Sequence, residues 1–214
     1  MNIKLIDFQG KNKKYFGGFI FQTSRHIQHV LLFVVVFLGL LTGSFFTKAD
    51  QNTYLSVAKI FNNYIEMISE FTFIKYFMLQ LVYNLGVVIL NFVFGLCAIG
   101  FPVPMMFCLI KGVSIGALSA FLYSEHAFIG FVYCLLILYP MQILNILVLL
   151  WSGKESIVMS GNILKQLTDK RQKGNNFCDL KMYITRYLIF IILIIATTLV
   201  SSVLSIYVVP LFNF

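Results

Sequence analysis

Charge is scarce in this sequence, and negative charge is the scarcest. Of 214 residues, 16 are Lys or Arg and 8 are Asp or Glu, so that only 11% are charged. A soluble globular domain carries about 25% charged residues, and the composition therefore excludes an ordinary soluble fold. Hydrophobic residues make up 59% of the chain instead, which is typical of a membrane protein.

Residues that carry chemistry are also few. The three histidines are His26 and His29, which flank the start of an apolar run, and His126, which lies in a predicted turn on the other side of the membrane. They cannot share a metal ion, and the four separated cysteines form no CxxC pair. Neither HExxH, GxSxG nor a Gly-rich phosphate loop is present. We therefore expect no enzyme, no cofactor, no metal and no small-molecule substrate.

Long apolar runs are what the chain does contain. Crossing a hydrocarbon core of about 30 Å takes about 20 helical residues, and a backbone in lipid must satisfy its own hydrogen bonds. Five runs meet that length: 27–47, 76–100, 101–123, 128–151 and 187–210. The predicted fold class is all-α, a polytopic membrane helix bundle of about five transmembrane helices.

Basic residues predict how the chain threads the membrane. Five precede the first run and seven lie between the fourth and fifth runs. Because short loops rich in Lys and Arg stay on the cytoplasmic side, we predict a basic cytoplasmic N-terminus at 1–26 and a basic cytoplasmic loop at 152–186. The first anchor then occupies 27–47, a three-helix core occupies 76–151, and the last helix with an outer C-terminus occupies 187–214.

This bias accounts for most of the net charge of +8 and suggests which partners the chain has. A basic loop suits the anionic lipid of the inner leaflet, so membrane lipid is an expected partner. A nucleic-acid site would need stacking aromatic residues among the basic ones, and the stretch 164–181 offers only Phe177. We expect no nucleic-acid partner.

The segment 48–75 is predicted to be an extracytoplasmic amphipathic helix. Its apolar residues recur at the spacing of one helix face, at Val57, Ile60, Phe61, Tyr64, Ile68 and Phe71. Such a helix either rests in the membrane interface without a partner or presents a docking surface, and both interpretations stay open. The candidate docking residues are Lys59, Asn63, Glu66 and Glu70.

Small residues and prolines gather in the middle of the chain. Pro102 stands where the second run turns into the third, and proline is tolerated in a first helical turn. Gly112, Gly116 and Ala120 are four residues apart, so they share a helix face that another helix can approach closely. The predicted helix-packing residues are Gly95, Gly100, Gly112, Gly116 and Ala120.

Lys111 places a charge inside the third run. Counted from Pro104 it lies about 10 Å into the helix, a depth at which a charge costs a few kcal/mol. Either the side chain snorkels to the cytoplasmic headgroups, or it meets a polar partner within the bundle. The candidate partners are Gln80, Asn84, Asn91, Gln142 and Asn145. No acidic residue lies in a predicted span, which argues against a proton relay.

The stretch Gly95–Pro102, the sequence Lys-Gly-Val-Ser-Ile-Gly at 111–116, Gly130 and Pro140 together resemble the stage II sporulation protein M family. Its members are short polytopic membrane proteins of endospore-forming bacteria, and the overall layout is similar as well. Within this resemblance Lys111, Pro102 and Pro140 are the candidate functional residues.

The resemblance implies a multi-pass cell-membrane scaffold at the sporulation septum. It would recruit extracytoplasmic peptidoglycan hydrolases to the engulfment machinery. The alternative is the membrane subunit of an ABC-type transporter, with the basic loop coupling to an ATPase. An inverted repeat would favour transport, and the runs show no clear internal similarity.

Overall fold

The computed structural model describes residues 25–70, 72–98, 100, 102–168 and 176–208. All regular structure in these ranges is helical, which confirms the all-α prediction. The elements are α2 (Arg25–Ala49), α3 (Gln51–Glu70), α4 (Phe73–Gly95), α5 (Pro102–Tyr133), the π-helix η1 (Cys134–Leu138), α6 (Tyr139–Thr168) and α7 (Asn176–Val208). Of the predicted basic N-terminus at 1–26, all but the last two residues lie outside the described ranges.

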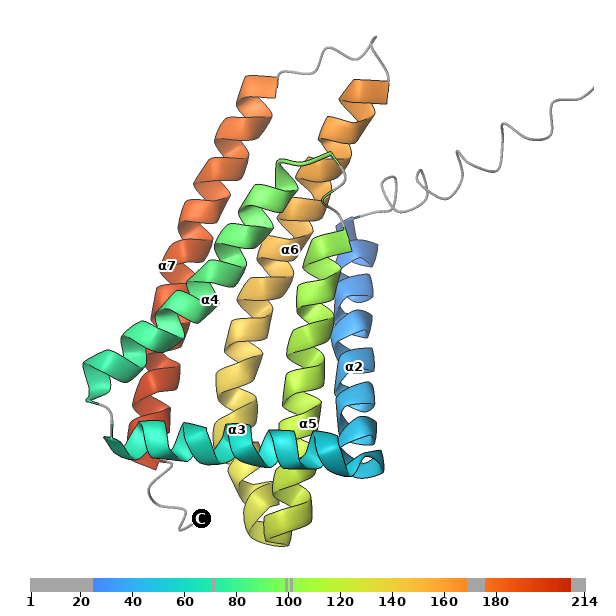
Figure 1. Ribbon diagram of the computed structural model, residues 1–214. Coiled ribbons are helices and arrows are strands. Elements are labelled where there is room, and N and C mark those ends of the chain that lie inside the picture. Colours follow the sequence, from blue (N-terminus) through green and yellow to red (C-terminus); the bar gives the residue numbers. More distant parts are fainter. Residues whose placement is uncertain (1–24, 71, 99, 101, 169–175, 209–214) are drawn as a thin grey trace, which may run out of the picture.

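Four segments of the described chain are long and apolar enough to cross a membrane. They are Gln28–Ala49, Phe73–Gly95, Pro102–Leu164 and Leu180–Tyr207. The third is 63 residues long and contains a non-helical residue, Ala127, with a φ of 41°. The chain reverses there, and α5 and α6 run antiparallel (Figure 1). Two of the five predicted runs therefore fall within one folded segment, and the chain is a multi-pass membrane protein.

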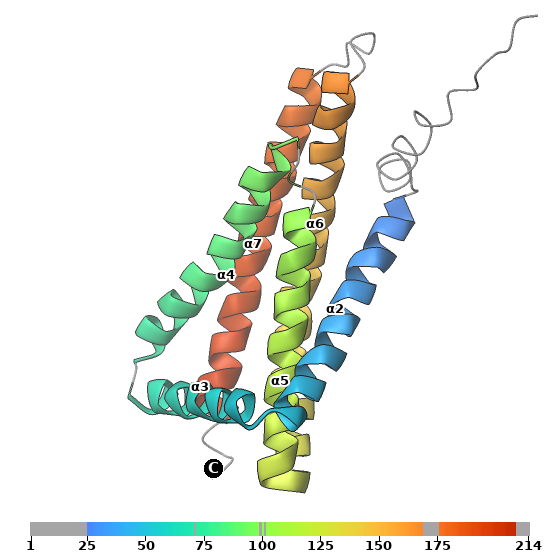
Figure 2. The ribbon, with the colours of Figure 1, turned by 45° about the vertical axis from the view of Figure 1, so that its right-hand side comes forward.

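Helix α3 lies across one end of the bundle, beside the turn between α5 and α6 (Figures 1 and 2). The connection from α4 to α5 and the adjacent ends of α6 and α7 lie at the opposite end. We call these the outer end and the inner end, following the topology predicted from the basic residues. Which of the two ends faces the cytoplasm stays a prediction.

The predicted loop at 152–186 needs correction, because most of it is helical. Helix α6 continues to Thr168 and α7 already begins at Asn176. Ser152, Ser156 and Ser160 recur every four residues and are completely buried. This polar stretch is therefore an internal helix face, and the connection between the two helices is short.

Three apolar clusters hold the helices together. Phe61 and Tyr133 belong to one beneath α3, at the outer end. Tyr187 belongs to a second, between α4, α6 and α7. Leu32 and Ile157 belong to a third, between α2, α5 and α6. The bundle thus has a packed interior along its length, and α3 closes its outer end.

Candidate functional site

Asp50 is the single residue between α2 and α3, and it fixes the start of α3. Its carboxylate accepts a hydrogen bond from the Thr53 hydroxyl at 2.6 Å and another from the Thr53 backbone N–H at 3.0 Å. These bonds lower the pKa of Asp50 below its ordinary value. The residue therefore stays ionised at a helix N-terminus, where the helix dipole favours negative charge.

The apolar stripe of α3 packs on the bundle. Phe61 is only 3% exposed, and its ring centroid lies 5.7 Å from that of Phe121 and 6.3 Å from that of Tyr133. Ile68 is buried as well, whereas Ile60 is 67% exposed. Protein therefore covers most of the apolar face of α3, and Ile60 is left exposed.

Two tyrosine hydroxyls tie α3 to other helices. Tyr54 donates a hydrogen bond to Glu125 in the turn between α5 and α6, and Tyr64 donates one to Ser205 of α7 at 3.1 Å. The bond to Glu125 raises the pKa of Tyr54, and burial raises the pKa of Tyr64. Both hydroxyls therefore keep their protons at neutral pH and act as donors.

The polar face of α3 points away from the bundle. Lys59, Asn63 and Glu66 are exposed there, while the side chain of Glu70 lies outside the described residues. An open groove of about 480 Å³ separates α3 from the α5–α6 turn. Its polar lining comes from Asn62, Glu66, Glu125 and His126. Three of the four predicted docking residues thus lie on one accessible surface.

A second hollow, of about 170 Å³, lies beneath α3. Its polar lining residues are Tyr64, Tyr76, Gln80, Tyr133 and Gln142. The π-helix η1 contributes to the same lining, and Pro140 explains why η1 forms. Proline has no N–H for the carbonyl four residues back, and its ring clashes with that carbonyl, so the turn before it widens. The backbone N–H of Tyr139 accordingly donates to the carbonyl of Cys134, five residues back. Such π-turns are frequent at functional sites.

The glycine face of α5 packs against α2. A Cβ atom placed on Gly116 would lie 2.2 Å from the carbonyl oxygen of Leu40, and one placed on Gly112 would lie 2.4 Å from another carbonyl of α2. The facing residues of α2 are themselves glycines, Gly39 and Gly43. Our reading of the sequence missed this second pair, although its four-residue spacing in the first apolar run was the available signal.

The remaining small residues lie at other contacts. Ala120 is buried, and a Cβ atom on Gly95 would lie 2.1 Å from the hydroxyl oxygen of Tyr183. A Cβ atom on Gly100 would lie 1.7 Å from a carbonyl oxygen in the last turn of α4. Pro102 is the first residue of α5, where its missing N–H leaves no helical bond unmade. Gly95, Gly100 and Pro102 shape the tight inner connection between α4 and α5.

Lys111 meets an aromatic ring, which neither of the predicted alternatives included. Its Nζ atom lies 4.6 Å from the centroid of the Tyr83 ring on α4, within range of a cation–π contact. Three of the predicted amide partners are hydrogen-bonded elsewhere: Gln80 to Ser202, Asn84 to Thr198 and Asn91 to Ser152. Among the described residues, no hydrogen bond reaches the Lys111 ammonium.

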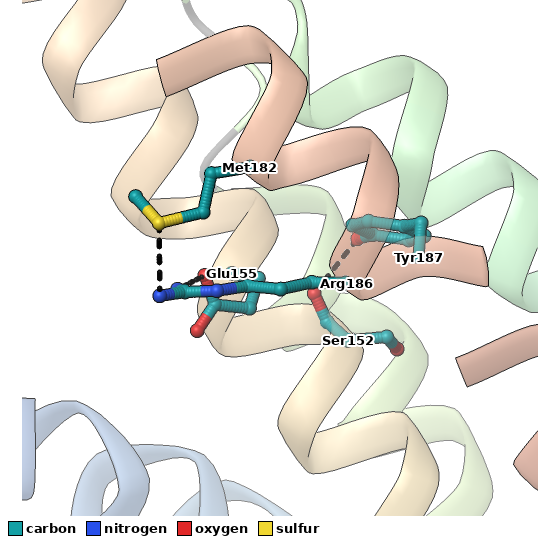
Figure 3. A network of polar contacts seen from close by, with 5 residues as sticks. All are labelled: Ser152, Glu155, Met182, Arg186 and Tyr187. Carbon is teal, nitrogen blue, oxygen red and sulfur yellow. Dashed lines mark hydrogen bonds and ion pairs between the residues drawn. The ribbon is translucent and has the colours of Figure 1, made fainter. Parts of the chain in front are cut away.

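The inner end holds a polar network that our reading of the sequence had assigned to a loop. Arg186 of α7 forms an ion pair with Glu155 of α6 at 2.5 Å (Figure 3). The hydroxyl of the next residue, Tyr187, donates a hydrogen bond to the carbonyl of Ser152 at 2.8 Å. Because these charged residues lie next to an apolar run, the sequence predicted a solvated connection. It did not predict that Glu155 and Arg186 pair between two helices.

Among the described residues, no three His, Cys, Asp or Glu side chains converge as metal ligands would. What the geometry does offer is a helix fixed across the outer end, with its polar face accessible and hollows beside and beneath it. This arrangement is suited to binding.

The sequence model of a family described as Stage II sporulation protein M matches residues 30–210 of this chain. The match covers helices α3 to α7 completely and most of α2. No curated protein and no solved structure matches the chain.

Proposed function

Because the chain belongs to the stage II sporulation protein M family, we propose that it is a scaffold of the sporulation septum that recruits peptidoglycan hydrolases during engulfment. The family makes it a sporulation-related membrane protein, and four apolar segments make it multi-pass. The observation that supports recruitment best is that α3 is fixed on the bundle while its polar face stays open.

Fixation matters because a preformed surface loses little conformational freedom when a partner binds. Tyr54 anchors the first half of α3, Phe61 its middle and Tyr64 its second half. Lys59 and Glu66 then project from a surface of defined shape. Charges at the rim of an interface mainly set the encounter rate and the orientation of the partner.

In this proposal the chain itself catalyses no reaction, and the hydrolysis of peptidoglycan is done by its partners. The helices at the inner end give the transporter alternative little support. A coupling helix for an ATPase would have to lie in the connection between α6 and α7, and that connection only joins Thr168 to Asn176. The predicted cytoplasmic loop that favoured the transporter is mostly helical, and its first part, with Ser152, Ser156 and Ser160, is buried.

Charge reversal on α3 tests the proposal. We expect the double variant Glu66→Lys, Glu70→Lys to copurify several-fold less of the wall hydrolases from sporulating cells, with membrane levels unchanged. The matched control is Lys181→Glu, which reverses an exposed charge at the inner end. Equal recovery from the double variant and the parent would refute α3 as the docking surface.

A further inference from the structure

Lys111 lies well inside the spanning segment Pro102–Leu164. It lies nine residues after Pro102, the start of α5, or about 13 Å along the helix. Its ammonium sits over Tyr83, which is twelve residues from Gly95 at the inner end of α4, or about 18 Å along that helix. The side chain therefore reaches sideways to α4 and does not turn back to the inner headgroups.

No carboxylate in the described part of the chain neutralises this charge. Glu155, the carboxylate at the inner end of α6, is paired with Arg186. Tyr83 supplies only the face of its ring, and a cation–π contact offsets only part of the cost of a charge in hydrocarbon. An ionisable residue in this position usually pairs with a group of opposite charge.

The Lys111–Tyr83 contact is open to the surrounding membrane. Tyr83 is 57% exposed and Lys111 is half-buried. Helices α4 and α5 approach each other at the inner end and diverge toward α3 (Figures 1 and 2). Leu118, two turns outward from Lys111, and Gln80, one turn outward from Tyr83, both line the hollow of about 170 Å³. We call these four residues the lateral surface.

We propose that the lateral surface binds a membrane-spanning helix of another protein that carries an Asp or Glu near its middle. Opposite charges attract strongly in the low dielectric of the hydrocarbon core, and pairing removes the need to bury either charge alone. The hollow beside Leu118 can receive an apolar side chain of the same helix, two turns outward from its carboxylate. This contact lies within the membrane and is independent of the docking surface on α3.

Two other sources of negative charge fit the geometry less well. A second copy of this chain has two carboxylates in its described spanning segments. Glu155 is paired with Arg186 at the inner end, and Glu125 is bonded to Tyr54 at the outer end. A lipid phosphate lies at the headgroup level, about 13 Å from Lys111 along α5. Neither group reaches the depth of the ammonium.

The test uses synthetic transmembrane helices as probes. The purified full chain is placed in phosphatidylcholine vesicles with Leu/Ala peptides of about 23 residues that carry Glu, Gln or Leu at the centre. Energy transfer between labels reports binding. We expect the Glu peptide to bind at least about tenfold more tightly than the Leu peptide, since a charge pair in hydrocarbon is at stake.

Variants of the chain test whether the preference for the Glu peptide depends on Lys111. Lys111→Met should abolish it and Lys111→Arg should keep it, while Lys111→Glu should instead prefer a peptide with a central Lys. Lys181→Met, at an exposed lysine of the inner end, is the matched control and should change nothing. Thermal unfolding of each variant shows whether it is folded, and Glu66→Lys should leave peptide binding unchanged.

The hollow is tested separately. Leu118→Trp should weaken binding of the Glu peptide, whereas Leu135→Trp, at a side chain that is 54% exposed, should not. Equal affinity for the three peptides, or a Glu preference that survives in Lys111→Met, would overturn the proposal. Loss of the preference when anionic phosphatidylglycerol replaces zwitterionic phosphatidylcholine would also overturn it, because an anionic lipid would then be the natural counter-charge.

Discussion

Adding one methyl group to Gly116 should push α2 and α5 apart. The new Cβ atom would lie 2.2 Å from the carbonyl oxygen of Leu40, whereas ordinary contacts begin at 3.4 Å. The shortfall of 1.2 Å, 3.4 minus 2.2, must come from movement of a helix, because the atom it meets belongs to the backbone. Overpacking of this kind typically costs about 1–3 kcal/mol.

Gly86 provides the control for this substitution. A Cβ atom placed there meets nothing within 4 Å, and the residue lies within α4. Alanine in place of a helical glycine gains about 1 kcal/mol in helix propensity at either position. The difference in free energy of unfolding between Gly116→Ala and Gly86→Ala therefore isolates the steric cost of about 1–3 kcal/mol.

Thermal or denaturant unfolding of the purified variants in one detergent measures this difference. Gly116→Ile, with a branched side chain at the same contact, should lower the amount of folded protein further. In combination with Gly116→Ala, Gly43→Ala should lower the free energy of unfolding by less than it does alone. The reason is that Gly116→Ala has already separated the two helices. Equal stability of Gly116→Ala and Gly86→Ala would refute the close contact between α2 and α5.

Two further predictions concern topology and the inner network. In a chain without its native cysteines, Glu66→Cys should react with an impermeant maleimide in intact cells, whereas Lys13→Cys should react only after lysis. Labelling of Lys13→Cys in intact cells would reverse the predicted topology. Glu155→Gln should lower stability by about 1–3 kcal/mol, between the values for exposed and buried ion pairs. In a double-mutant cycle with Arg186→Gln, a coupling energy near zero would show that the pair contributes nothing.

The sequence was most informative where composition and spacing act locally. Apolar runs predicted the spanning helices, and the stripe that includes Phe61 predicted α3, since both patterns depend on residues close together in the chain. The four-residue spacing of Gly112 and Gly116 predicted a face that a helix could approach, but not which helix would do so. Spacing identifies a face, whereas its partner is chosen by the packing of the whole bundle.

The errors have a common physical origin. Ser152, Ser156 and Ser160 are polar and fall in the stretch predicted to be a cytoplasmic loop, yet they are completely buried. Small side chains let helices approach closely, and the hydroxyls of Ser152 and Ser160 donate hydrogen bonds to backbone carbonyls. Lys111 was predicted either to extend to the headgroups or to contact an amide side chain. Its contact with the ring of Tyr83 was not predicted. In a membrane helix bundle, the polarity of a residue alone does not show whether it lies in a loop or in the interior.

The position of α3 depends on contacts with residues that lie far downstream in the sequence. Tyr54 bonds to Glu125, 71 residues away, and Tyr64 bonds to Ser205, 141 residues away. The second bond cannot form until α7 has been inserted, so α3 gains its full set of anchors only in the complete bundle. A docking surface built in this way becomes rigid only on a chain that has finished folding. Under the proposed function, a hydrolase that requires the rigid surface would therefore not be recruited by an incompletely folded chain.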